Sequence, residues 1–152
     1  MKNLKICVVG LGYVGLPIYL KLRNYFYTLG FDSNLKRIKS LKKGIDLNKE
    51  FNKSQIFNKK KNIFTNRDID LKSANFFIIC VPTPIYENKK PDLRLLEKAC
   101  KLIGKNLKKN DIIFFESTVY PGVTNDICKK ILENTSKLKA KKDFLIGYSP
   151  ER

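Results

Sequence analysis

The sequence of 152 residues has no histidine and no tryptophan, and none of its four cysteines forms a Cys-x-x-Cys pair. Without histidine there is no Ser-His-Asp or Cys-His arrangement, and the commonest general base and transition-metal ligand is missing. The cysteine spacing indicates neither a zinc site nor a thioredoxin-like redox pair. We therefore expect no metal site, and any chemistry must use carboxylates, lysines, hydroxyl groups or a bound cofactor.

Long apolar runs and a signal sequence are missing as well. No stretch approaches the roughly 20 apolar residues that a membrane helix needs. Residues 1–3 lead directly into a strand-like run and leave no room for a charged region, an apolar stretch and a cleavage site in series. These absences predict a cytoplasmic protein without a membrane partner. The length favours a single domain, residues 1–152, with a substantial buried core.

Acidic residues are scarce, since 14 Asp and Glu face 31 Lys and Arg and give a formal net charge of +17. Such a charge by itself would indicate a polyanion such as RNA or DNA. The excess is mostly lysine spread along the chain, however, and arginine, which suits planar phosphate recognition, is rare. The densest run, 59–61, is typical of a solvated turn. We expect no nucleic-acid partner; a basic nucleic-acid binder stays an alternative, which RNA binding across a salt series would test.

What the chain does contain is a glycine-rich turn between a strand-like run and an amphipathic segment. The run 4–9 leads into Gly10-Leu11-Gly12-Tyr13-Val14-Gly15. Gly10 permits a tight turn, Gly12 leaves no side chain where a pyrophosphate approaches the backbone, and Gly15 lets the helix lie close to the strand. The amide groups at the start of that helix then face the phosphates. This arrangement predicts a dinucleotide site.

Asp32 strengthens that prediction. It closes the second strand-like run, 25–31, about 20 residues beyond the glycines, where an acid accepts hydrogen bonds from the adenosine ribose. A carboxylate there repels a 2′-phosphate, so the sequence favours NAD over NADP. Lys36 and Arg37 follow closely and leave NADP open.

The remaining pattern predicts the fold class. Strand-like runs at 4–9, 25–31, 62–65, 75–81, 112–115 and 143–147 alternate with helical spacing after Gly15 and over 34–42, 92–107 and 124–132. With right-handed crossovers this is an α/β fold, a Rossmann-type doubly wound parallel six-stranded sheet with helices on both faces. The polar segment 47–61 predicts no element, and Phe51, Ile56 and Phe57 are its expected buried contacts. The four cysteines are expected to be small buried apolar groups.

Functional residue types gather at the ends of five of these strands. Ligands bind at the carboxyl edge of such sheets, so we expect all five strand ends to face one crevice. They are the glycine turn, Asp32, Val81-Pro82-Thr83, Glu116-Ser117-Thr118 and Ser149-Pro150-Glu151.

In this order, the strand ends resemble the N-terminal NAD-binding domain of the UDP-glucose/GDP-mannose dehydrogenase family. Within the family, the residues of these segments most resemble those of the bacterial UDP-N-acetylhexosamine (UDP-N-acetylglucosamine) 6-dehydrogenases of surface-polysaccharide synthesis. The matching segments are 8–17, 30–32, 81–84, 91–93, 116–122 and 147–152. The resemblance implies oxidation of a sugar C6 alcohol to a carboxylate, with two NAD molecules used in succession and an aldehyde-level intermediate.

The resemblance also implies a role for each matching residue. The residues expected to bind the adenine and pyrophosphate end of NAD are Gly10, Gly12, Tyr13, Val14, Gly15, Asp32 and Arg37. Those expected to line the middle of the cleft are Val81, Pro82 and Thr83, with Ser117 and Thr118 near the nicotinamide. Catalytic roles are implied for Thr118, which would orient a water, and for Glu151, which would support the later hydrolytic step.

This chain departs from the family's pattern in two respects. The first helix carries Tyr19, Lys21 and Arg23 where small or apolar residues are usual, and Asn48 replaces a common threonine. The family's nucleophilic cysteine, catalytic lysine and asparagine lie in a central helix and a C-terminal UDP-sugar-binding domain, which would follow Arg152. The sequence as given is therefore expected to bind NAD without turnover and to meet a UDP-sugar only together with that missing half. The resemblance is compatible with a homodimer of the full-length enzyme, and it leaves the oligomeric state of the isolated domain open.

Two further alternatives stay open from the residues. One is the NAD-binding domain of another hydroxyacid or sugar-phosphate dehydrogenase, because fold alone does not fix function. The other is a non-catalytic remnant that retains only nucleotide binding.

Overall fold

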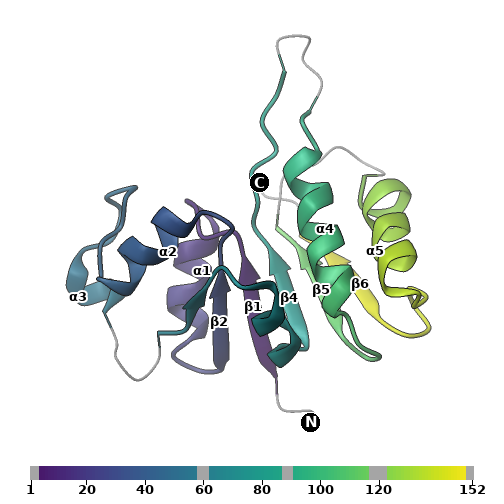
Figure 1. Ribbon diagram of the computed structural model, residues 1–152, viewed down its shortest axis with the longest axis horizontal. Helices are drawn as coiled ribbons and strands as arrows, with labels where there is room; N and C mark the ends of the chain where they lie inside the picture. The colour runs from purple at the N-terminus through teal and green to yellow at the C-terminus, as the bar shows by residue number, and fades with distance from the viewer. Residues whose placement is uncertain (1–3, 58–61, 87–90, 117–122, 150–152) are drawn as a thin grey trace.

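One six-stranded parallel sheet forms the centre of the molecule (Figure 1). The computed structural model describes residues 4–57, 62–86, 91–116 and 123–149. The strands follow the spatial order β3-β2-β1-β4-β5-β6, and every neighbouring pair is parallel. They are β1 (Lys5–Val9), β2 (Tyr27–Phe31), β3 (Phe64–Thr65), β4 (Phe76–Ile79), β5 (Ile112–Phe115) and β6 (Leu145–Tyr148). The predicted Rossmann-type sheet is confirmed.

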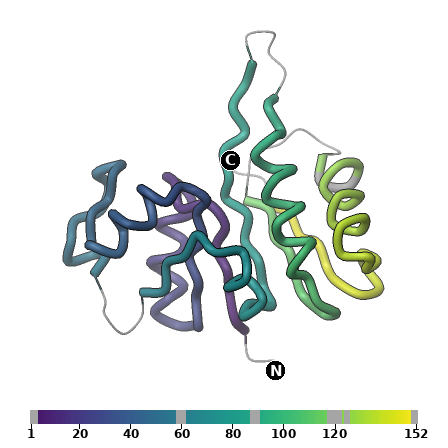
Figure 2. The backbone as a smooth tube through the Cα atoms, in the orientation of Figure 1, coloured from purple at the N-terminus to yellow at the C-terminus, as the bar shows by residue number. Residues whose placement is uncertain are grey.

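The helices divide into two groups on opposite faces of the sheet (Figure 2). The first face is covered by α1 (Gly15–Leu22), α2 (Leu35–Lys42) and α3 (Lys53–Ile56). The second face is covered by α4 (Arg94–Asn106), the π-helical segment η2 (Val123–Cys128) and α5 (Lys129–Ser136), together with the short 3₁₀ segment η1 (Asp68–Ser73). This division follows from right-handed crossovers, which run outward from β1 in opposite directions across the sheet.

Each central strand is buried on both faces, as a parallel sheet requires. Along β1, Ile6 and Val8 belong to the core of the first face, whereas Cys7 and Val9 belong to the core of the second. This alternation explains why β1 and β4 are continuous apolar runs. All four cysteines are buried and none forms a disulfide, in agreement with the expectation that they serve as small apolar groups.

Several element boundaries differ from the prediction. The helix predicted over 124–132 begins with the π-helical turn η2 and runs on to Ser136, ending at Lys137 in the left-handed conformation (φ 64°). The strand β2 starts at Tyr27 rather than at residue 25, because the amides of Tyr25 and Phe26 still bond to the Leu22 carbonyl. Among the described segments, no helix combines the length and apolar character needed to span a bilayer.

The segment 47–61 contains a helix that the sequence analysis missed. The four-residue α3 begins with a capping box in which Asn52 accepts from the Gln55 amide and Gln55 accepts from the Asn52 amide. Ile56 is fully buried and Phe51 partly buried, as expected, but Phe57 is 45% exposed, so that prediction was wrong.

The unusual side chains of α1 hold this segment in place. Tyr19 is fully buried, its hydroxyl accepts from the Ile63 amide at 2.8 Å, and burial raises its pKa to about 12. Arg23 donates to the carbonyl oxygens of Gln55 and Ile56 at 2.7 and 2.6 Å. Tyr19 and Arg23, two of the residues that depart from the family's pattern, therefore connect the end of α1 with the chain that leads into β3.

Candidate cofactor site

The glycine turn after β1 has the geometry that its residues predict. Gly10 adopts φ +93° and donates to the Phe31 carbonyl at 2.9 Å, and a Cβ there would lie only 2.9 Å from the Cys80 carbonyl oxygen. A Cβ on Gly15 would collide with the Gly10 carbonyl oxygen. Gly10 is thus required by the turn and by the approach of β4, and Gly15 by the contact between helix and strand.

Gly12 is different, because nothing in the protein requires it to be glycine. Of the described glycines, it is the one with ordinary φ at which a Cβ would meet no atom within 4 Å. The space beside it is open and belongs to the cavity described below. A glycine kept free of side chain beside open space fits a ligand that approaches the backbone, as predicted for a pyrophosphate.

The first turn of α1 is also prepared for an anion. Its N-cap residue Val14 makes no side-chain hydrogen bond to the helix, and no acidic residue lies in the first turn. By contrast, Asn34 caps α2 by accepting from the amides of Lys36 and Arg37. Within α1 the Leu16 amide already donates to the Gly12 carbonyl at 3.1 Å and Pro17 has no amide, so the amides that suit a ligand phosphate are those of residues 12–15, at the turn and the very start of the helix.

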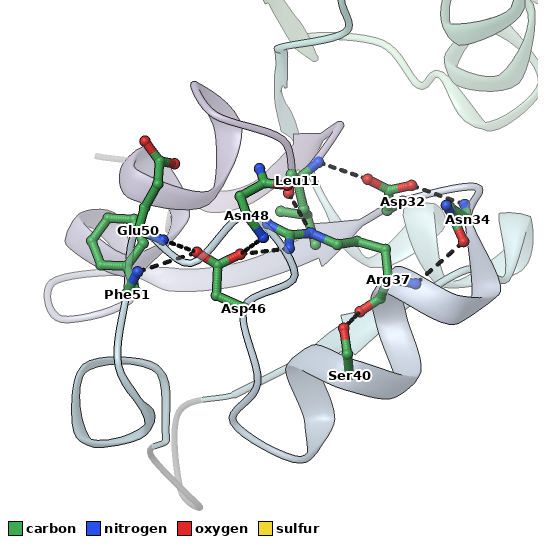
Figure 3. Close-up of polar contacts among 9 residues, drawn as sticks. All are labelled: Leu11, Asp32, Asn34, Arg37, Ser40, Asp46, Asn48, Glu50 and Phe51. Atoms are coloured by element: carbon green, nitrogen blue, oxygen red, sulfur yellow. Dashed lines mark hydrogen bonds and ion pairs between the residues drawn. The ribbon is translucent and has the colours of Figure 1, made fainter.

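Asp32 ends β2 beside this turn. Its Oδ2 accepts from the Leu11 amide at 2.9 Å and its Oδ1 from the Asn34 amide at 2.8 Å (Figure 3). Each oxygen keeps a lone pair for a further donor, as an adenosine ribose hydroxyl would be. The carboxylate therefore both fixes the glycine turn and lines the site.

A cavity of about 470 Å³ joins these features, a size suited to part of a dinucleotide. Three of the five predicted strand ends line it, through Gly10 and Gly12, Asp32, and Val81 and Pro82. Ser117, Thr118 and Glu151 lie outside the described residues, so their predicted positions are untested. Within the described part of the chain, no three potential metal ligands come together.

The sequence analysis missed the other walls of the cavity. Leu95, Lys98, Ala99 and Leu102 line it from α4, and Asp68 lines it from the start of η1. The helix α4 carries a second apolar row, Leu96, Cys100 and Ile103, which is fully buried in the core. Two parallel rows on one helix were the available signal, since one row is enough to bury a helix on a sheet.

The remaining predicted cofactor residues lie near the cavity but are not among those that line it. Tyr13 is 66% exposed, while Val14 and Thr83 are partly buried. The Arg37 side chain is only 7% exposed and turns inward, where Nε donates to the Leu11 carbonyl at 2.9 Å and Nη1 pairs with Asp46 at 2.6 Å. Arg37 therefore contacts the glycine turn from the interior of the protein.

Asp46 is the buried counterion of Arg37. Burial opposes its charge, but the Arg37 guanidinium and the amides of Asn48, Glu50 and Phe51 together hold its pKa below the usual range. The carboxylate is fully buried and ionised in the fold.

The residues present fit a dinucleotide. The open backbone at Gly12 and the uncapped α1 suit a diphosphate, and Asp32 suits a ribose. The apolar row of α4 faces the cavity where a flat adenine ring would lie against it. This arrangement can hold and orient a cofactor, and its titratable groups among the described lining residues are two carboxylates, a lysine and a buried cysteine rather than a histidine.

Comparison with known proteins agrees with this fit. Residues 4–152 match the family model described as "UDP-glucose/GDP-mannose dehydrogenase family, NAD binding domain". The chain is 49% identical over 152 residues to the UDP-N-acetyl-D-glucosamine 6-dehydrogenase of Pseudomonas aeruginosa, covering 100% of this chain and 36% of that protein. It is 44% identical to the enzyme of the same name from Salmonella typhi, over 99% of this chain and 35% of that protein.

Solved structures give the same result. A ternary complex of GDP-mannose dehydrogenase from Pseudomonas aeruginosa superposes with a TM-score of 0.90 at 25% identity, over 98% of this chain and 36% of that one. The UDP-D-ManNAc dehydrogenase of Pyrococcus horikoshii gives 0.87 at 32% identity, over 98% and 36%. The chain thus spans about 36% of the length of these relatives, and the cofactor implied is NAD. The chain belongs to the UDP-glucose/GDP-mannose dehydrogenase family, in which it corresponds to the NAD-binding domain.

Proposed function

We propose that this chain is the cofactor half of an NAD-dependent dehydrogenase that oxidises the C6 alcohol of a UDP-N-acetylhexosamine to a uronate for polysaccharide synthesis. The observation that carries the proposal is the cavity joining Gly12 to Asp32, in a chain 49% identical throughout to a UDP-N-acetyl-D-glucosamine 6-dehydrogenase. The chain also matches "Protein CapL" of Staphylococcus aureus at 48% identity, again over only 35% of a longer protein's length, which supports the assignment to one part of a larger enzyme.

The mechanism divides between what this chain holds and what it lacks. Bound NAD supplies the hydride acceptor. The backbone amides of residues 12–15 bind the diphosphate, and Asp32 accepts from the adenosine ribose. Val81 and Pro82 line the path toward the nicotinamide, where Ser117 and Thr118 are proposed to lie. Thr118 is proposed to orient a water and Glu151 to support hydrolysis, once a second domain brings the UDP-sugar.

The choice of NAD over NADP tests the cofactor site. Asp32 and Asp68 both line the cavity, so a 2′-phosphate would meet two carboxylates and only one lysine, Lys98. We expect calorimetric titration to show NAD binding at least about tenfold tighter than NADP. Asp32→Ala should narrow that ratio. Equal affinities for the two cofactors in the unmodified chain would contradict the assignment of Asp32.

Dehydrogenase activity tests the division into two halves. The chain alone should produce no NADH from UDP-N-acetylglucosamine, because it spans about 36% of its dehydrogenase relative and we propose that the UDP-sugar site and the nucleophile belong to the remainder. A chimera in which this chain replaces the first third of the Pseudomonas aeruginosa relative should produce NADH. Strong NADH production by the chain alone would overturn the proposal that the UDP-sugar site lies outside residues 1–152.

The remaining assignments belong to the same proposal. We infer that residues 1–152 form one domain, that a C-terminal UDP-sugar domain completes the enzyme, and that the complete enzyme is a homodimer. A cytoplasmic location is supported by the four buried cysteines, none of which forms a disulfide, as is typical of a reducing compartment.

A further inference from the structure

The peptide groups around Leu11 are held by side chains from β2 and α2. The Leu11 amide donates to Asp32 Oδ2 at 2.9 Å, and the Leu11 carbonyl accepts from Arg37 Nε at 2.9 Å (Figure 3). The Leu11 side chain is fully buried. Both hydrogen-bonding groups of the residue between Gly10 and Gly12 are therefore occupied from inside the protein.

Arg37 is fixed in turn by Asp46, and Asp46 by the turn that follows it. Arg37 Nη1 lies 2.6 Å from Asp46 Oδ1, which also accepts from the Asn48 amide at 3.0 Å. Asp46 Oδ2 accepts from the amides of Glu50 and Phe51 at 2.9 and 3.2 Å. One fully buried carboxylate thus takes four donors, and the chain of contacts runs from residues 46–51 to the glycine turn.

The geometry of the peptide bond gives these contacts a consequence at the cavity. The carbonyl of Leu11 and the amide of Gly12 belong to one planar trans peptide, so they point in opposite directions. Because Arg37 draws the carbonyl inward, the Gly12 amide is turned outward. Gly12 lines the cavity and has open space beside it.

We propose that Arg37 and Asp46 are positioning residues that aim the Gly12 amide at the cofactor diphosphate. Arg37 acts through the Leu11 peptide rather than by lining the cavity, and Asp46 keeps the Arg37 guanidinium in place. The inference builds on the NAD site described above and adds Asp46, at a distance from the cavity, to the residues on which diphosphate binding depends.

The chain offers a matched control in Arg23. Its side chain is also buried, it also donates to backbone carbonyls, and like Arg37 it has one buried nitrogen without a partner among the described residues. The carbonyls it holds are those of Gln55 and Ile56, away from the glycine turn. If losing any buried arginine weakened diphosphate binding, variants at both positions would weaken it equally. If the orientation of the Gly12 amide is what matters, only the variant at Arg37 would weaken it.

The experiment compares ADP with adenosine, which lacks the diphosphate, by NMR titration of the whole chain. Arg37→Lys and Asp46→Asn should lower the ratio of ADP affinity to adenosine affinity by about tenfold or more, since lysine lacks the two separate nitrogens that reach Leu11 and Asp46, and asparagine lacks the charge that holds Arg37. Arg23→Lys should lower the urea midpoint and leave that ratio within about twofold of the unmodified chain. An unchanged ratio in Arg37→Lys and Asp46→Asn, or an equal fall in Arg23→Lys, would overturn the inference.

A second measurement needs no variant that must fold. In the ¹⁵N-labelled unmodified chain, ADP should shift the Gly12 amide proton strongly downfield, and adenosine should not. The amide of Gly44, which donates to Leu41, serves as the reference and should stay in place. ADP binding without a shift at Gly12 would contradict the positioning role alone, whereas absence of ADP and NAD binding would contradict the proposed function.

Discussion

The two faces of the sheet are stabilised in different ways. On the first face, buried polar side chains make directional contacts to the backbone, as Tyr19, Arg23, Arg37 and Asp46 do. On the second face the core consists of apolar side chains and cysteines from the sheet, α4 and α5. Its buried polar groups, such as Asp92, Asn106 and Asp111, lie where helix and strand begin or end.

This difference corresponds to the use of each face. Apolar packing is nondirectional and tolerates small shifts, which is enough to support helices behind a sheet. A diphosphate site needs particular amides at particular angles, and hydrogen bonds to buried charged groups specify such angles. The polar contacts therefore occur on the face whose helices carry the glycine turn.

The largest expected effect comes from the apolar face. Phe77 is fully buried in the core of the second face and does not line the cavity. Phe77→Ala should lower the free energy of unfolding by about 3–5 kcal/mol through lost burial and a residual cavity. Urea unfolding measures the loss of stability. Calorimetric titration without denaturant, where the variant is folded, should find the NAD affinity unchanged. A matching loss of NAD affinity would break the distinction between the faces.

A pair of glycine variants separates binding from stability within the turn itself. Gly12→Ala should leave the urea midpoint unchanged, because its Cβ meets no protein atom, and weaken NAD binding by about ten- to a hundredfold, because the methyl group occupies cofactor space. Gly15→Ala should instead lower the midpoint, because its Cβ collides with the Gly10 carbonyl oxygen. If Gly12→Ala bound NAD normally, the open space beside it would have no functional meaning.

A pH series sharpens the role of the buried carboxylate. The pKa of Asp46 is lower in the folded protein than in the unfolded chain, so Asp46 stabilises the fold above the unfolded value, about 3.9, and that contribution is lost as pH falls through the folded value. Urea unfolding between pH 6 and 2.5 should show a shallower acid loss for Asp46→Asn than for the unmodified chain. Asp126→Asn, on the exposed side of η2, should keep the original profile.

The smallest effect is expected from an ion pair on the second face whose arginine is exposed. Arg94 pairs with Asp92 at 2.7 Å, and the Arg94 side chain is 72% exposed. Solvent screens the guanidinium, and Asp92 keeps the Arg94 backbone amide as a donor, so Arg94→Gln should leave the urea midpoint and NAD affinity unchanged within error. A clear loss of stability would mean that the second face also depends on polar contacts.

The contrast between the faces also explains which features the sequence could predict. The strand β5 spans the predicted residues 112–115, and α2 follows its Asn34 cap, because apolar runs and caps are local signals. The inward turn of Arg37 depends on Asp46, nine residues away, and on the Leu11 carbonyl, 26 residues away. No local pattern encodes such a contact. Arg37, which was expected to bind NAD, therefore lies on the interior side of the glycine turn rather than among the residues that line the cavity.

The helix α3 shows a different reason for failure. Its signal was present, since Asn52 and Gln55 form a capping box, but four residues are too few for an apolar periodicity. The cavity walls on α4 were missed because apolar spacing identifies a helix but does not distinguish a row that packs in the core from a row that lines a cavity.

The doubly anchored Leu11 peptide has a kinetic consequence. The conformational entropy of ordering this turn is lost during folding rather than at the moment of encounter, so the free protein presents a preorganised surface. Coenzyme capture should accordingly follow a single second-order phase in stopped-flow experiments, with no concentration-independent isomerisation step.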